Sequence, residues 1–316
     1  MKKILYILAC IVCAGCTQDE ILDLDKEFRL MFQPGMYMHV SSTGVEDFSI
    51  NQTLGVCAWQ LPEAKDNVTD LAGATLYLDI AEAHSEMMVE KPVPQSTHDV
   101  YWVVGDDAWQ VDSKPVAFMA YAPYQMPCRC DATDGITCSV DIQKDQTDLL
   151  YTEPQTAKQH TTLGWMVPLV FKHAMAQIQF RVCHRVTLAE KIIVKGISIE
   201  SIKHQGDFAS LRNPQWILTD SIAPLTYFKD EQTVGQIAKR VGNGQLIIPQ
   251  KLDSRVKVEY DYVTADGISV PMETYLDKRL TSQLKPGNTY IYTLSISRAD
   301  AKFQLENIEH RFDINE

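Results

Sequence analysis

Cysteine is the residue type that offers the most chemistry in this sequence, and Cys16 has the most informative surroundings. The chain begins with two lysines in its first three residues, continues with an apolar run from Ile4 to Ala14 and places Gly15 directly before Cys16. This is the layout of a signal peptide, and small residues before a cysteine are typical of the site at which bacterial signal peptidase leaves a lipid-modified cysteine. The apolar run is shorter than the ~20 residues that span a membrane. Cys10 is a rival acceptor, but it would leave too short an apolar core. We therefore predict a signal peptide at residues 1–15 and lipidation at Cys16.

Five cysteines follow this segment, and three of them cluster in one short stretch. Cys128, Cys130 and Cys138 lie among turn-forming residues, where a short loop disulfide can form after export. The spacing leaves open which two of the three are joined. A zinc site is not expected, because no fourth cysteine or histidine follows at ligand spacing. Cys57 and Cys183 lie in apolar strand patterns and are predicted to be buried thiols.

Other residues that could do chemistry lack the partners that catalysis needs. His173 lies in an apolar strand pattern and is interpreted as a packing histidine, and the carboxylates of Asp106 and Asp107 lie among turn residues, without the apolar setting that raises a carboxyl pKa. The sequence has no Gly-x-Ser-x-Gly elbow and no glycine-rich phosphate loop, and Gly242-Asn-Gly244 is interpreted as a tight turn before a strand. We expect no catalytic triad, no metal and no cofactor, and we predict that the protein is not an enzyme.

Two features are related to sugars. Asp220-Ser221-Ile222 resembles the short motif at which some anaerobes attach O-glycans to exported proteins, so Ser221 is a candidate glycosylation site. Trp102 and Trp109 flank a predicted hairpin and could stack on sugar rings, although tryptophans beside strand turns more often fill the end of a sandwich. These aromatic residues support one alternative function, that of a glycan-binding surface lipoprotein in a polysaccharide-uptake system.

The charge of the chain narrows the range of partners. Without Lys2 and Lys3 the mature chain has 27 basic and 41 acidic side chains, a net charge of −14. This acidity disfavours a nucleic-acid partner. No run of Lys or Arg offers a patch for anionic lipid heads, so we expect the membrane contact to be the acyl chains on Cys16 alone.

Strand patterns dominate the chain after the signal peptide. Residues 16–29 are mostly polar and form a predicted tether, and beyond them short β-rich segments alternate with turn residues. In residues 176–182, Gln and Arg alternate with Ile, Phe and Val, so that one face is dry and the other wet, as in an antiparallel sandwich sheet. A polar stretch at residues 152–160 is the best candidate boundary. We predict an all-β chain with two sandwich domains, at residues 30–155 and 160–316.

An ordered series of short phrases resembles the fimbrillin family, the subunits of type V pili and their relatives. The phrases run through most of the mature chain and lie at residues 54–59, 115–124, 148–151, 167–178, 246–250 and 284–292. The resemblance implies that both domains are transthyretin-like β-sandwiches. It also implies a surface subunit that contributes to cell adhesion, at the outer membrane or in a fimbrium.

The resemblance implies assembly by β-strand addition, in which a subunit loses an N-terminal strand to a protease and receives a strand from its neighbour. Arg29 stands where a protease that cuts after arginine could act, and the segment from Cys16 to Arg29 would then be a removable plug; a plain tether arginine is the alternative. Residues 302–312 are either a final sheet strand, which we favour, or a donor strand. The expected partners are other pilus subunits, outer-membrane lipid through acylated Cys16, and candidate host or bacterial surface receptors.

Overall fold

The computed structural model describes residues 29–36, 53–62, 68–87, 100–103, 115–156, 159–161, 164–298 and 300–310. This part of the chain is all-β, with strands β1 to β21 in four sheets, which confirms the predicted fold class. Among the same residues there is no helix of the length and apolarity needed to cross a membrane.

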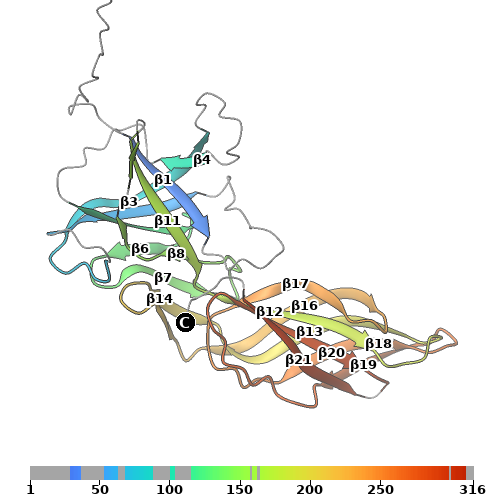
Figure 1. The fold of residues 1–316 in the computed structure, drawn as a ribbon. Coiled ribbons are helices and arrows are strands. Elements are labelled where there is room, and N and C mark those ends of the chain that lie inside the picture. The colour runs from blue at the N-terminus through green and yellow to red at the C-terminus, as the bar shows by residue number, and fades with distance from the viewer. Residues whose placement is uncertain are drawn as a thin grey trace, which may run out of the picture.

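The first sheet closes on itself. Its neighbouring strands pair antiparallel, except that β1 runs parallel to β11 while also pairing with β4 (Figure 1). Its strands are β1 (Arg29–Met36), β2 (Leu54–Gln60), β3 (Thr75–Met87), β4 (Val100–Val103), β5 (Val116–Ala122), β8 (Leu150–Thr152), β9 (Gln155–Thr156), β10 (Gln159–Thr161) and β11 (Gly164–His173).

A small second sheet contains strands from both halves of the sequence. Its order is β15-β14-β7-β6, and β7 pairs antiparallel with β14 from Thr137 to Asp141. The strands are β6 (Cys128–Asp131), β7 (Gly135–Asp141), β14 (Gln205–Ala209) and β15 (Gln215–Leu218). The predicted boundary stretch at residues 152–160 contains β9 and the start of β10 of the first sheet, and this sheet continues past it to His173. The division into two domains stays a prediction.

Two four-stranded sheets make up most of the remaining chain. One has the order β17-β12-β20-β21 and the other β16-β13-β18-β19. In β12 the predicted dry face is confirmed, since Ile178, Phe180 and Val182 are fully buried. On the predicted wet face Arg181 is exposed, but Gln177 is buried. The strands are β12 (Ala176–His184), β13 (Lys191–Lys203), β16 (Ile222–Val234), β17 (Lys239–Ile247), β18 (Val256–Val263), β19 (Ser269–Tyr275), β20 (Asn288–Ile296) and β21 (Ala301–His310).

Strands β2 and β5 are buried on both faces, which explains their almost unbroken apolar sequence. One face, with Val56 and Phe118, lies in an apolar cluster shared with β11. The opposite face, with Trp59 and Met119, belongs to a larger cluster that continues through the second sheet into the last two sheets. Apolar burial is therefore continuous from this face of β2 and β5 through the second sheet into the last two sheets.

Candidate functional site

The strand nearest the N-terminus fills a slot between two other strands. The eight residues of β1 pair with β11 in parallel, from Arg29 opposite Gly164 to Met36 opposite Phe171. On its other side, Met31 and Phe32 pair with β4. Removal of β1 would thus leave two unpaired strand edges, each with free backbone donors and acceptors.

Arg29 is the first residue of β1. The structure describes no residue before Arg29, and a cut after Arg29 would leave Leu30 to Met36 of this strand in the chain. Cleavage at Arg29 stays a prediction. Cys16 and the rest of the predicted tether lie outside the described residues.

The last described strand, β21, pairs antiparallel with β20 from Ala301 opposite Ile296 to His310 opposite Asn288. It is the outer strand of its sheet, with β20 as its one neighbour among the strands that the structure describes. The structure thus has a sheet strand at residues 301–310, which agrees with the preferred prediction of a final strand at residues 302–312 as far as the described residues reach. Whether β21 also acts as a donor strand is a separate question. An outer strand can leave a sheet without breaking the pairing between the other strands.

One disulfide lies within the second sheet, and another ties the second sheet to the first. Cys128 is joined to Cys138 across the hairpin of β6 and β7, with the Cα atoms 4.3 Å apart. Cys130 is joined to Cys57 of β2, with a Cα separation of 6.8 Å. The prediction of a buried thiol at Cys57 is wrong, because the outer face of β2 packs on the second sheet, where Cys130 lies within reach. Cys183 is a buried free thiol, as predicted.

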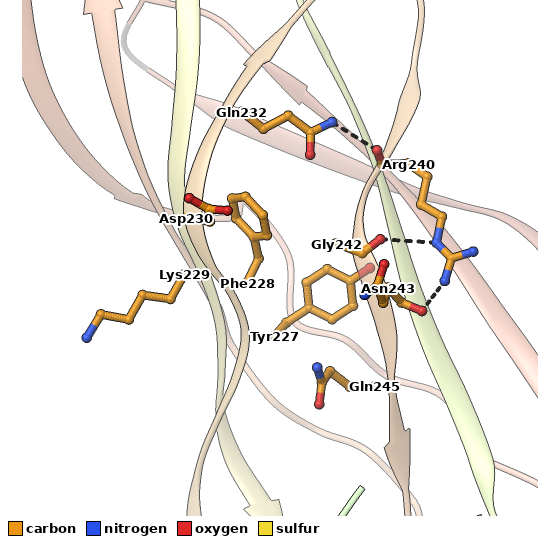
Figure 2. A pocket seen from close by; sticks show the side chains of 9 residues that line it. All are labelled: Tyr227, Phe228, Lys229, Asp230, Gln232, Arg240, Gly242, Asn243 and Gln245. Carbon is orange, nitrogen blue, oxygen red and sulfur yellow. Dashed lines mark hydrogen bonds between the residues drawn. The ribbon is translucent and has the colours of Figure 1, made fainter.

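An open groove of about 580 Å³ lies between β16 and β17, the outer strands of the two C-terminal sheets. Phe228 and Asp230 line it from β16, and Arg240 and Asn243 line it from β17 (Figure 2). The guanidinium group of Arg240 donates to the carbonyl oxygens of Gly242, at 3.1 Å, and of Asn243. The groove therefore offers hydrogen-bond donors and acceptors beside the aromatic rings of Tyr227 and Phe228.

A bulge in β17 shapes this groove. Gly242 and Gly244 both have positive φ, at 65° and 84°, a backbone conformation that glycine adopts without strain. They lie inside β17, so the prediction of a turn before the strand is wrong. The hydroxyl of Tyr227 bridges the interrupted ladder: it accepts from the Phe180 N–H at 3.0 Å and donates to the Val241 carbonyl at 2.7 Å. Burial of this phenol raises its pKa.

Ser221 is hydrogen-bonded to His204, which in turn is hydrogen-bonded to Asp141. The sequence pattern singles out neither His204 nor Asp141. Oγ of Ser221 is 2.9 Å from Nε2 of His204, and Nδ1 of His204 is 2.9 Å from Oδ1 of Asp141. His204 is buried, whereas Ser221 is exposed. The fold thus brings together three residues that are 17 and 63 positions apart in the sequence, and the expectation that the chain has no catalytic triad stays a prediction. Glycosylation of Ser221 stays a prediction.

Asp141 is held as a carboxylate by its surroundings. Burial alone would raise its pKa, but hydrogen bonds from Gln205, His204, Lys144 and the Gln143 backbone outweigh burial and bring the pKa well below its ordinary value. The Gln205 amide lies 3.0 Å from Oδ2 of Asp141. An ionised carboxylate favours a proton on Nδ1 of His204 and leaves the lone pair of Nε2 for the serine hydroxyl.

The other candidates from the sequence have structural surroundings or lie outside the described part. Nδ1 of His173 in β11 is hydrogen-bonded to the carboxyl group of Asp148, which precedes β8, in keeping with its interpretation as a packing residue. Trp102 belongs to β4, and Trp109 lies outside the described residues. Within the described ranges, no group of three His, Cys, Asp or Glu side chains is placed to hold a metal ion.

Comparison with known proteins gives consistent similarities. The sequence model of the family described as fimbrillin-like matches residues 49–314. The fimbrium subunit Fim1C of Phocaeicola vulgatus is 24% identical over 275 residues, which cover 78% of this chain and 69% of that protein.

Solved structures show the same fold. A fimbrial protein from Bacteroides vulgatus superposes with a TM-score of 0.61 at 17% identity, covering 89% of this chain and 99% of that one. A candidate cell adhesion protein from Bacteroides ovatus has a TM-score of 0.53 at 15% identity, covering 92% and 100%. At these identities the likeness concerns the fold alone.

Proposed function

Because this chain belongs to the fimbrillin-like family, whose model matches residues 49–314, we propose that it is a surface subunit of a bacterial fimbrium that joins its neighbours by β-strand addition. The observation that carries this proposal is the position of β1 between β11 and β4. A strand at one end of the chain closes a sheet that would otherwise have two open edges.

The slot of β1 is suited to a strand from another subunit. It offers pairing over eight residues along β11, and the sheet around it has an apolar cluster that includes Phe118, Leu169 and Phe171. An incoming strand would satisfy the backbone groups of both edges. Any strand with backbone N–H groups at the right spacing can do this, so the slot does not require the chain's own β1.

The donor in this proposal is β21. It makes nine residue pairs with β20, and its departure leaves the other pairs of that sheet intact. The sequence of β21 alternates apolar Phe303 and Leu305 with polar residues, as a strand with one buried face requires. In the proposed assembly, β21 of one subunit replaces β1 of the next.

Cleavage after Arg29 would prepare the exchange by freeing one end of β1. Arg29 is the first arginine of the chain, and the next one is Arg129 in β6. After the cut, Leu30 to Met36 would be a terminal strand that an incoming strand can displace from its free end. Before the cut, acylated Cys16 would hold the subunit at the outer membrane, so the same chain is an anchored precursor and then an assembling subunit.

The test is assembly of the trimmed protein. The mature chain is treated with an arginine-specific protease, and mass spectrometry checks that it now begins at Leu30. We expect a ladder of SDS-resistant oligomers. The Arg29→Ala variant is the matched control and should stay monomeric under the same treatment. A chain that ends at Asp300 lacks β21 and should form no ladder by itself.

Two results would contradict the proposal. One is a correctly trimmed and folded protein that stays monomeric at high concentration. The other is a ladder of equal extent from the chain that ends at Asp300. Tight binding of polysaccharide by a protein that forms no ladder would favour the glycan-binding alternative. The mass of the N-terminal peptide from the native cell surface would show directly whether acylated Cys16 or Leu30 is the start.

A further inference from the structure

Three connections between strands meet where Ser221, His204 and Asp141 lie. Asp141 is the last residue of β7, His204 is the one residue between β13 and β14, and Ser221 directly precedes β16. Backbone hydrogen bonds fix the meeting point: the Ile142 N–H donates to the His204 carbonyl at 3.0 Å, and the Thr219 N–H donates to the Gln205 carbonyl at 3.0 Å. The three side chains are thus positioned by sheet ends, which are more rigid than free loops.

The contacts run from Ser221 to His204 and from His204 to Asp141. This is the order found where a serine nucleophile contacts its base and a carboxylate orients that base. Asp141 contacts Nδ1, so that Nε2 faces the serine, and Oγ of Ser221 lies 2.9 Å from that nitrogen. Such a constellation is recognised by geometry and not by sequence order. The second oxygen of Asp141 contacts Gln205 and Lys144, which keeps the carboxylate from turning away from the imidazole.

We propose that Ser221 is a nucleophile that accepts an acyl group from activated esters, with His204 as its base and Asp141 as a positioning residue. Ser221 is exposed, so an ester can reach Oγ from solvent. This inference concerns a group that the proposed strand exchange does not use, and it does not depend on a role in fimbriae.

The chemistry balances without any further reactant. A bond forms between Oγ of Ser221 and the carbonyl carbon of the ester while the proton of Oγ passes to Nε2 of His204. The bond from that carbon to the alcohol oxygen then breaks, and His204 returns the proton to the leaving oxygen. Water then attacks the acyl carbon while it gives a proton to Nε2 of His204. The bond between this carbon and Oγ breaks, and His204 returns the proton to Oγ, which restores the hydroxyl.

The first test compares two serines within the unaltered protein. Ser139 is also exposed and donates to the carboxylate of Asp207 at 2.6 Å, a contact that involves no histidine. The full chain is treated with a biotin-tagged fluorophosphonate, which loses fluoride when a serine oxygen attacks phosphorus. Mass spectrometry gives the labelled fraction at each serine over time. We expect label at Ser221 and none above background at Ser139; equal labelling would overturn the proposal.

Variants then assign the roles. Ser221→Ala should remove the label, and Ser139→Ala should leave it unchanged. His204→Ala should slow labelling by roughly 100-fold, since a positioned base contributes about that much or more, and added imidazole should restore part of the rate. A merely structural histidine would not show such rescue. Asp141→Asn should slow labelling, with partial recovery in Asp141→Glu. Unchanged labelling in a folded His204→Ala variant would also overturn the proposal.

Discussion

At the scale of single residues, Tyr227 shows how one side chain can repair a sheet. The bulge at Gly242 to Gly244 breaks the ladder between β12 and β17, and the register shifts between Ile178 and Phe180. The Tyr227 hydroxyl fills the gap with two hydrogen bonds to backbone groups that are buried. Its ring also packs edge-on against Phe180, with the ring centroids 4.7 Å apart.

Tyr227→Phe should therefore destabilise the fold although it removes a single oxygen atom. The change leaves the Phe180 N–H and the Val241 carbonyl without this partner, and each buried group left unsatisfied costs about 1–3 kcal/mol. The measurement is the free energy of unfolding in urea. Tyr275→Phe is the matched control, because its hydroxyl contacts Glu200 at the surface, and it should change stability by less than about 0.5 kcal/mol. Equal effects of the two variants would contradict the proposed role of the bridge.

The residues of the Ser221 site mark a limit of sequence analysis. Ser221 attracts attention through the motif around it, but His204 and Asp141 lie in separate parts of the chain and carry no signal of their own. Their contact depends on the pairing of β7 with β14, which joins the two halves of the chain. Local patterns predict strands well and carry little information about which distant strands pair.

At the scale of elements, the alternation of apolar residues identifies several strands correctly, including β12, β18 and β20. The closing position of β1 is not predictable in this way. A short apolar strand is compatible with many edges, and the parallel pairing with β11 joins residues far apart in the chain. The disulfide between β2 and β6 escapes prediction for the same reason, because Cys57 lies in a pattern that suits any buried strand.

The two disulfides should stabilise the second sheet and, through Cys57 and Cys130, its join to the first sheet. They close sequence separations of 73 and 10 residues, and loss of native disulfides costs typically 2–5 kcal/mol. Cys57→Ala combined with Cys130→Ala should lower the free energy of unfolding by an amount in this range. Reductant should lower the melting temperature of the unaltered protein.

Cys183→Ala keeps both disulfides and serves as the control. It should remain as sensitive to reductant as the unaltered chain. A melting temperature that reductant does not change would show that the bridges do not contribute to stability.

At the scale of the whole molecule, the second sheet makes one body of the two halves of the chain. Its aromatic residues join the halves directly: Phe208 packs between Tyr151 and Trp216, with ring centroids 4.8 and 5.2 Å away. The indole N–H of Trp216 donates to the Ala174 carbonyl at 2.7 Å. Because the buried cluster is continuous through this region, the halves should unfold together.

Phe208→Ala tests this coupling. The ring is almost fully buried, so its loss should cost about 3–5 kcal/mol and separate a single unfolding transition into two. Urea unfolding followed by circular dichroism and by tryptophan fluorescence should coincide in the unaltered protein and diverge in the variant. Ile217→Ala is the control, since that side chain is 65% exposed, and its two curves should still coincide. Two separate transitions in the unaltered protein would contradict the prediction.

The pairing of β1 also has a mechanical consequence. Tension applied through the residues that precede Arg29 would act on β1, which forms eight residue pairs with the parallel strand β11. A pull along the strand axis loads these hydrogen bonds together, in shear, whereas a sideways pull opens them one after another. The hydrogen bonds between β1 and β11 would therefore withstand the drag of fluid flow at the cell surface. A strand that enters from one end could still replace them one after another.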